Sequence, residues 1–97
     1  MSGTDFPLDL RGSHSELLRT YVRRRLHFLG SRMLGRLESA TIVVLPGAPA
    51  TCNLELVIDG RGTRTGAGSG PDVKIAFDLA VEDLLAGLGK DRRARRE

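Results

Sequence analysis

A cationic helical face is the feature of this sequence with the clearest chemistry. Residues 13–36 (SHSELLRTYVRRRLHFLGSRMLGR) hold six arginines and a single acid, Glu16. The polar side of the expected helix carries Arg19, Arg23, Arg24 and His27, with Arg25 at its edge. A solvated helix usually mixes charge signs, and guanidinium groups donate paired hydrogen bonds to phosphate oxygens. The face therefore indicates either a plain soluble surface or a site for an anionic partner such as a phosphate backbone.

A second basic segment closes the chain. Residues 90–97 (KDRRARRE) and the helix together hold eleven of the fifteen Lys and Arg residues, although the formal net charge is only +3. This segment has no apolar face, so we expect it either to be disordered or to extend the preceding helix when an anion orders it. The sequence predicts one domain over residues 1–89 and a basic tail over 90–97.

Catalytic and metal-binding patterns are weak. The second expected helix carries four acids, Asp72, Asp78, Glu82 and Asp83, and one lysine, Lys74. This composition is typical of a solvated acidic face rather than of a buried acid–base pair. Ser13 stands beside His14, but it is better placed to cap a helix than to act as a nucleophile. We expect no enzyme activity, no cofactor and no small-molecule substrate.

Cys52 is the single cysteine of the 97 residues, so no intrachain disulfide can form. Without a second thiol, a structural zinc site is not expected, and Cys52 is interpreted as a buried strand residue. The N-terminus has no apolar run typical of a signal peptide, and no segment approaches the roughly 20 apolar residues that span a bilayer. We therefore expect a cytoplasmic protein without a membrane partner.

The glycine run 66–70 precedes the second helix, where phosphates often bind. It lacks the Lys-Ser/Thr of a Walker A loop, and Pro71 stands where a dinucleotide fingerprint needs glycine. We interpret the run as a flexible strand-to-helix turn, with an incidental contact to RNA phosphate as the alternative. The aromatic residues mostly belong to apolar stripes, which favours recognition of RNA shape and backbone over base stacking.

Hydrophobic periodicity predicts the elements that position these residues. Phe6, Leu8 and Leu10 alternate with polar residues as in a strand, and Pro7 favours an edge position or a start at Leu8. Ser13 and Glu16 form a capping-box pattern for a helix that ends near Gly30. Its buried stripe should comprise Leu18, Val22, Leu26, Leu29 and Met33, widened by Leu17 and Tyr21.

Three more strands and a helix should follow. We predict strands at 40–45, at 52–58 and, weak and at an edge, at 62–67, with positive φ at both residues of an Asp59-Gly60 hairpin turn. Ser69 or Gly70 should cap the second helix, Pro71 should lie in its first turn, and the helix should stop near Leu88. Its buried stripe should comprise Val73, Phe77, Val81, Leu84 and Leu88. The order β-α-β-β-β-α predicts an α+β two-layer sandwich, with both helices on one face of a four-stranded, mainly antiparallel sheet.

Local patterns add a family resemblance. Leu10-Arg11-Gly12, the helix segment 18–29 (LRTYVRRRLHFL), the strand 40–45 (ATIVVL) and the segment 72–78 (DVKIAFD) stand in the order found in another group of proteins. Over residues 6–93 the chain resembles the ribosome hibernation promoting factor and ribosome-associated inhibitor A family, in its short form. The resemblance implies a stress-response protein that regulates translation by occupying the decoding channel of the small ribosomal subunit.

The chain departs from that family at several charged positions. Asp83 and Ala86 stand where the second helix usually carries Lys and Arg, Lys74 replaces a usual Tyr, and Phe28 replaces a common Lys. The loop after Gly12 is also about two residues shorter than is usual there. The resemblance therefore implies that the tail takes over part of the RNA contact, or that binding has changed.

Two functional hypotheses follow. In the first, a non-enzymatic protein binds rRNA of the small subunit through two sets of basic residues: Arg11, Arg19, Arg23, Arg24, Arg25 and Lys74, and then Lys90, Arg92, Arg93, Arg95 and Arg96. In the second, the chain is a protein-interaction module that docks a basic partner through its acidic second helix or an open sheet edge.

Overall fold

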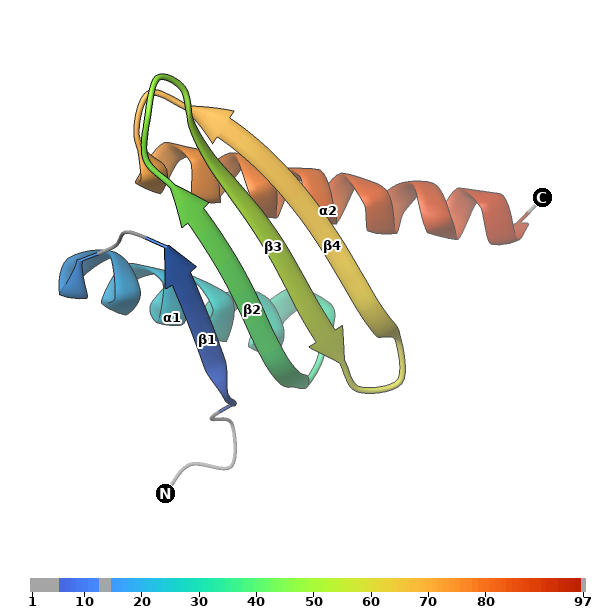
Figure 1. Cartoon of the computed structure of the whole chain (residues 1–97). Coiled ribbons are helices and arrows are strands. Elements are labelled where there is room, and N and C mark those ends of the chain that lie inside the picture. Colours follow the sequence, from blue (N-terminus) through green and yellow to red (C-terminus); the bar gives the residue numbers. More distant parts are fainter. Residues whose placement is uncertain (1–5, 13–14, 97) are drawn as a thin grey trace.

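The computed structural model describes residues 6–12 and 15–96, and within that range it leaves the side chains of 33, 34 and 88–96 undescribed. The elements are β1 (Leu8–Gly12), α1 (Glu16–Leu29), a π-helical turn η1 (Gly30–Leu34), β2 (Leu37–Leu45), β3 (Ala50–Ile58), β4 (Gly62–Gly70) and α2 (Val73–Arg96) (Figure 1). The predicted order of strands and helices is confirmed.

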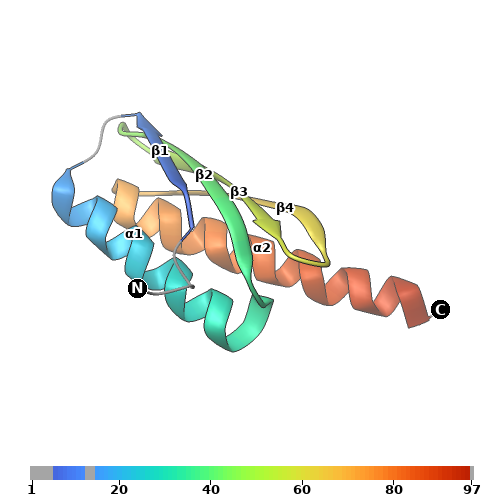
Figure 2. The ribbon, with the colours of Figure 1, turned by 90° about the horizontal axis from the view of Figure 1, so that it is seen from below.

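The sheet has the spatial order β1-β2-β3-β4. β1 pairs in parallel with β2, and the β2–β3 and β3–β4 pairs are antiparallel. Both helices lie side by side on one face of the sheet, and no helix of the described residues lies over the opposite face (Figure 2). The structure confirms the predicted fold, including the edge positions of β1 and β4, and shows a mixed sheet that is mostly antiparallel.

A single core lies between the sheet and the helices. Strand residues alternate between buried and exposed because successive side chains point to opposite faces. The buried set includes Leu8 and Leu10 of β1, Ile42 and Val44 of β2, Cys52, Leu54, Leu56 and Ile58 of β3, Leu18, Val22, Leu26 and Leu29 of α1, and Phe77, Val81 and Leu84 of α2. Apart from Leu17, the predicted stripes are confirmed where their side chains are described, with Val73 partly buried.

The buried thiol of Cys52 gives a first testable consequence. Burial raises the pKa of Cys52 to about 11, and the neutral thiol is a poor nucleophile. We expect an aromatic disulfide reagent at pH 8 to modify native Cys52 at least about 100-fold more slowly than the urea-unfolded chain, because exposure requires unfolding. The rate is followed by absorbance. Equal rates in the two states would contradict the buried placement.

The start of α1 differs from the prediction in two respects. Ser15, not Ser13, is the N-cap, and its hydroxyl accepts a hydrogen bond from the Leu18 N–H at 3.2 Å. Ser13 and His14 lie outside the described residues. The second difference is Leu17, which is 84% exposed and does not widen the buried stripe. A helix that starts at Glu16 turns Leu17 away from the sheet.

The end of α1 is also not a simple stop at Gly30. The chain continues through the π-helical turn η1, and Gly35 has a φ of 94°, which an L side chain rarely adopts. β2 then begins at Leu37, three residues before the predicted start at residue 40. Leu37 is buried, so this early start adds another apolar side chain to the core.

The interpretation of residues 66–70 as a flexible strand-to-helix turn was wrong, because the strand predicted over 62–67 continues to Gly70 as β4. A Cβ on Gly66 would lie 2.3 Å from the carbonyl oxygen of Ala80, and one on Gly68 would lie 2.5 Å from that of Ala76. The absence of side chains thus allows the backbone of α2 to approach the strand. Ala76 and Ala80, which are fully buried, complete this close packing.

The turn before β4 was also predicted incorrectly. Positive φ occurs at Gly60 and Gly62, not at Asp59, so the hairpin has a three-residue connection in place of a two-residue turn. The two glycines adopt the positive φ that the connection requires, so Asp59 keeps a negative φ.

α2 starts and ends differently from the prediction. Its cap is Asp72, whose Oδ1 accepts a hydrogen bond from the Ile75 N–H at 2.9 Å, in place of Ser69 or Gly70. The helix does not stop near Leu88 but runs to Arg96, beyond the edge of the sheet (Figure 1). Arg, Lys and Ala all favour helices, and a single interior glycine costs only about 1 kcal/mol, so Gly87 and Gly89 do not end it.

Candidate nucleic-acid interface

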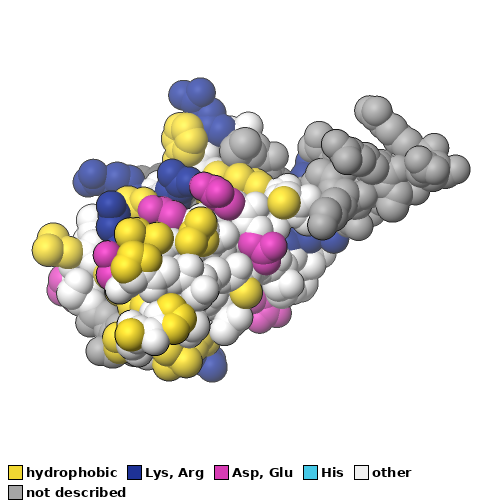
Figure 3. All heavy atoms as spheres, turned by 90° about the horizontal axis from the view of Figure 1, so that it is seen from above, with side chains coloured by type: hydrophobic (Ala, Val, Ile, Leu, Met, Phe, Trp, Pro, Cys, Tyr) yellow, Lys and Arg dark blue, Asp and Glu magenta, His cyan; other side chains and the backbone are white. Residues whose placement is uncertain are grey.

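The polar side of α1 forms a shallow basic depression. An open hollow of about 410 Å³ is lined by Glu16, Arg19, Thr20, Arg23, Arg24 and His27. Arg24 is exposed, and Arg19 and Arg23 are half-buried. Figure 3 shows several Lys and Arg side chains beside hydrophobic and acidic ones on the face seen from above. The predicted grouping of these arginines on one side of α1 agrees with the structure.

Arg23 has a structural contact in addition to its place in the hollow. Its Nη1 donates a hydrogen bond to the Phe6 carbonyl at 3.3 Å, and its guanidinium carbon lies 5.5 Å from the centroid of the Phe6 ring. The His27 ring lies 5.7 Å from the same ring. Arg23 therefore holds the segment before β1 against α1, and its replacement would disturb packing as well as charge.

Arg25, on the flank of α1 toward α2, and Lys74, in the first turn of α2, both lie near Tyr21. The Lys74 ammonium is 4.8 Å from the centroid of the Tyr21 ring, and the Tyr21 hydroxyl donates a 2.6 Å hydrogen bond to Asp78 Oδ1. That hydrogen bond, and secondly burial, raise the pKa of Tyr21, while the charge of Arg25 lowers it. Within the described part of the chain, the buried Nε of Arg25 has no hydrogen-bond partner. These residues form a contact between the helices, separate from the basic depression.

The Tyr21–Asp78 hydrogen bond gives a second prediction. We expect Tyr21→Phe to lower the free energy of unfolding by about 1–2 kcal/mol, because a charge-assisted hydrogen bond between the helices is lost. Urea denaturation of Tyr21→Phe, Asp78→Asn and the double variant measures the coupling between the two side chains. Additive effects of the two single changes would show that the contact contributes nothing.

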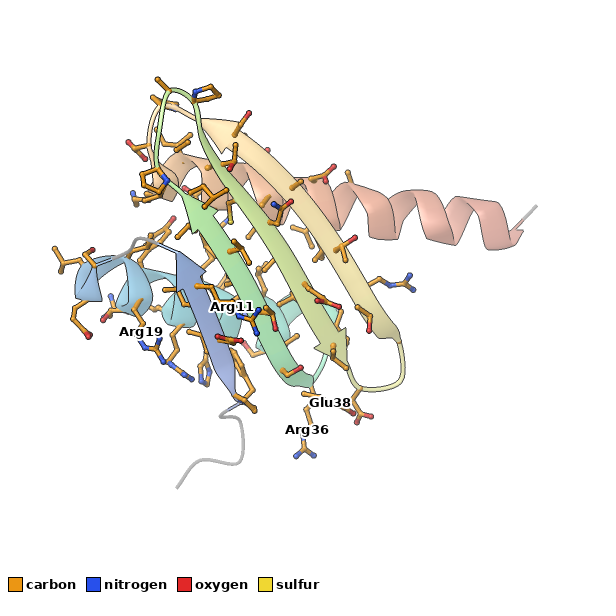
Figure 4. The ribbon with its side chains drawn as sticks, in the orientation of Figure 1. Arg11, Arg19, Arg36 and Glu38 are labelled. Atoms are coloured by element: carbon orange, nitrogen blue, oxygen red, sulfur yellow. The ribbon has the colours of Figure 1, made fainter. Side chains whose placement is uncertain are left out.

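Arg11 is separated from the other predicted RNA-binding residues. Arg11 lies over the face of the sheet opposite the two helices, whereas Arg19 projects from α1 behind the sheet (Figure 4). The Arg11 guanidinium forms an ion pair with Asp9 at 2.8 Å, and this hydrogen bond and charge raise the pKa of Arg11. The pair is exposed, so it contributes little to stability. Arg11 would contact an anion only from the opposite side of the molecule.

Three acids at α2 make specific hydrogen bonds within the fold, which a solvated acidic face does not require. Asp72 caps the helix and Asp78 holds Tyr21, while Asp83 Oδ2 accepts a 3.0 Å hydrogen bond from the Ala67 N–H of β4. Glu82 is exposed. Because Asp78 is committed to Tyr21, the two acids one turn apart do not form a shared site. No local signal in the sequence could reveal the contacts of Asp78 and Asp83, since their partners Tyr21 and Ala67 lie 57 and 16 positions away.

The remaining predicted residues lie in the last turns of α2. The backbone of Lys90, Arg92, Arg93, Arg95 and Arg96 is helical, and their side chains lie outside the described set, so their role stays a prediction. No group of three His, Cys, Asp or Glu residues suited to a metal occurs in the described residues. The helices of the described chain include none that is long and apolar enough to cross a membrane.

Comparison with known proteins finds a similarity in fold alone. No family model and no curated protein matches the sequence. A solved structure, a ribosomal subunit interface protein from Coxiella burnetii, matches with a TM-score of 0.71 and 17% sequence identity, over 90% of this chain and 98% of that chain. The resemblance to the ribosome hibernation promoting factor and ribosome-associated inhibitor A family, predicted from local patterns, is therefore confirmed as a match of structure at low sequence identity.

Proposed function

We propose that this chain is a non-enzymatic, ribosome-associated protein that binds rRNA of the small subunit through the basic depression on α1. The observation that supports the proposal most is the grouping of Arg19, Arg23 and Arg24 around one open hollow. The hollow lies on a fold shared with a protein described as a ribosomal subunit interface protein. The guanidinium groups of arginines at such a surface can donate paired hydrogen bonds to phosphate oxygens.

The residues have unequal parts in this proposal. Arg19 and Arg24 make the main phosphate contacts. Arg23 adds positive charge to the hollow while its side chain donates a hydrogen bond to the Phe6 carbonyl. Arg25 and Lys74 extend the basic surface toward α2, and the residues from Lys90 to Arg96 make a second contact from the overhanging end of that helix. Arg11 contacts a different RNA segment on the far face of the sheet. The site we propose on the subunit is the decoding channel, where the bound protein holds ribosomes idle.

Co-sedimentation with purified small ribosomal subunits tests this proposal. Because phosphate contacts release counterions, we expect binding at about 50 mM salt that falls at least about tenfold by 200 mM. Absence of binding at low salt would refute a ribosomal role. Binding that resists salt would refute phosphate recognition by the arginines and favour a different surface.

The alternative is a protein-interaction module that uses the acidic second helix or a sheet edge. Asp83 accepts a hydrogen bond from the Ala67 N–H at the β4 edge, so this donor cannot pair with a partner strand. The five-residue β1 is therefore the edge more available for pairing with another chain. Binding that is insensitive to nuclease and is lost on changing Asp78 and Glu82 would favour this function over RNA binding.

A further inference from the structure

The outer surface of α1 has exposed hydrophobic side chains between its arginines. Leu17 is 84% exposed and Phe28 is 53% exposed, and Arg24 lies between them on the same side, at steps of seven and four residues. The Arg32 guanidinium stacks 5.3 Å from the centroid of the Phe28 ring. Phosphate recognition does not need these apolar side chains. We name Leu17, Arg24 and Phe28 the basic–apolar patch.

The outer surface of α2 has the same pattern with the opposite charge. Ile75 is 39% exposed and Leu79 is 40% exposed, and the exposed Glu82 follows three residues after Leu79. These residues lie opposite the buried side of α2, which carries Ala76, Phe77 and Ala80. We name Ile75, Leu79 and Glu82 the acidic–apolar patch.

Both patches face away from the sheet on one layer of the molecule. Each lies on the side of its helix opposite the buried stripe, and the two helices run side by side under the sheet (Figure 2). The patches are therefore complementary in charge and alike in apolar content. A second copy of the chain, turned by a two-fold axis, can place its acidic–apolar patch on the basic–apolar patch of the first, and the reverse contact follows by symmetry.

We propose that this chain forms a two-fold homodimer through its helical layer, with α1 of each copy against α2 of the other. The molecule measures 40 × 37 Å in its two longer extents, so this layer is large enough for an interface of about 800 Å² per protomer. With few apolar side chains in each patch, we expect a weak dimer with a dissociation constant on the order of 10 μM. The pairing covers Arg24 and leaves Arg19 on the flank of α1.

Sedimentation velocity over a concentration series, on the full chain without ribosomes, tests the pairing. We expect a monomer–dimer transition that stops at the dimer, because a two-fold contact closes on itself. Leu17→Asp should raise the dissociation constant at least about tenfold, because it puts a charge into an apolar contact. Leu17 is almost fully exposed, so the fold should persist, as far-UV circular dichroism would confirm.

A charge swap gives the sharper test. Arg24→Glu alone and Glu82→Arg alone each place like charges in both halves of the contact, so each variant should stay monomeric. An equimolar mixture of the two restores both opposite-charge pairs and should form a dimer of one copy of each. Arg61→Glu, in the exposed β3–β4 connection, is the control and should dimerise like the native chain.

Two results would overturn the proposal. One is a native chain that stays monomeric up to about 1 mM, a concentration far above the expected dissociation constant. The other is a dimer that persists unchanged in Leu17→Asp and in Arg24→Glu, which would place the contact on another face. If the chain is monomeric and Leu17→Asp instead weakens ribosome binding, the basic–apolar patch belongs to the ribosome contact.

Discussion

Replacement of Gly66 by alanine is expected to lower the free energy of unfolding by about 3 kcal/mol or more, a large part of the 5–15 kcal/mol typical of a small domain. The added Cβ would lie 2.3 Å from the Ala80 carbonyl oxygen and 2.9 Å from the Leu84 Cβ. Neither is the end of a flexible side chain, so α2 itself has to move away from β4. The loss of packing would spread along the helix because Phe77, Val81 and Leu84 are buried against the sheet by the same approach.

Gly87→Ala is the matched control for this change. Gly87 lies in α2, and a Cβ added to it would have nothing within 4 Å, so alanine meets no obstacle there. Because alanine is the better helix former, this variant should gain up to about 1 kcal/mol. Thermal unfolding should show a midpoint at least about 10 °C below native for Gly66→Ala and at or above native for Gly87→Ala. Similar midpoints for Gly66→Ala and the native chain would show that β4 and α2 are not in close contact.

The second large effect is expected at the basic depression. The double variant Arg19→Ala/Arg24→Ala should lose about 10–100-fold in affinity for small ribosomal subunits at low salt, because two phosphate contacts are removed. The slope of log affinity against log salt should fall by about 1.5–2 for the same reason. Neither arginine has the Phe6 contact that makes Arg23 part of the packing. Binding is measured at protein concentrations well below the expected dimer dissociation constant, so that pairing through Arg24 does not affect the result.

The control for this experiment removes equal charge elsewhere. Arg36 and Arg61 are exposed, just before β2 and in the β3–β4 connection, and neither lines the basic depression. Arg36→Ala/Arg61→Ala lowers the net charge by the same amount, so it should change the affinity only through the overall field. An equal loss in both double variants would mean that net charge, and not the depression on α1, determines binding.

The sequence was informative where local periodicity determines structure. Leu18, Val22, Leu26 and Leu29 repeat at helical spacing, and all four are buried in α1. The alternation of Phe6, Leu8 and Leu10 with polar residues likewise predicted which side chains at β1 are buried. The order of the elements and the layer arrangement followed from these patterns, because each amphipathic face needs an opposing one.

The parts that could not be predicted depend on contacts across the chain. Local composition indicated a loop at residues 66–70, but the approach of Ala76 and Ala80 makes the glycines necessary in a strand. Composition also indicated a plain acidic surface on α2, whereas Tyr21, 57 positions away, determines the role of Asp78. The sequence also grouped Arg11 with the α1 arginines, although the alternation of side chains in β1 turns it to the opposite face of the sheet.

The hydrogen bond between Asp83 and the Ala67 N–H also affects how the chain behaves when it is crowded. The outward N–H and C=O groups of an edge strand such as β4 can pair with a foreign strand, which is the first step of edge-to-edge aggregation. The Asp83 carboxylate accepts a hydrogen bond from the Ala67 N–H, so this donor of β4 cannot pair with an incoming strand. The carboxylate also places negative charge where that strand would lie. The position where the resemblance leads one to expect a basic residue therefore protects the strand that the glycines leave exposed.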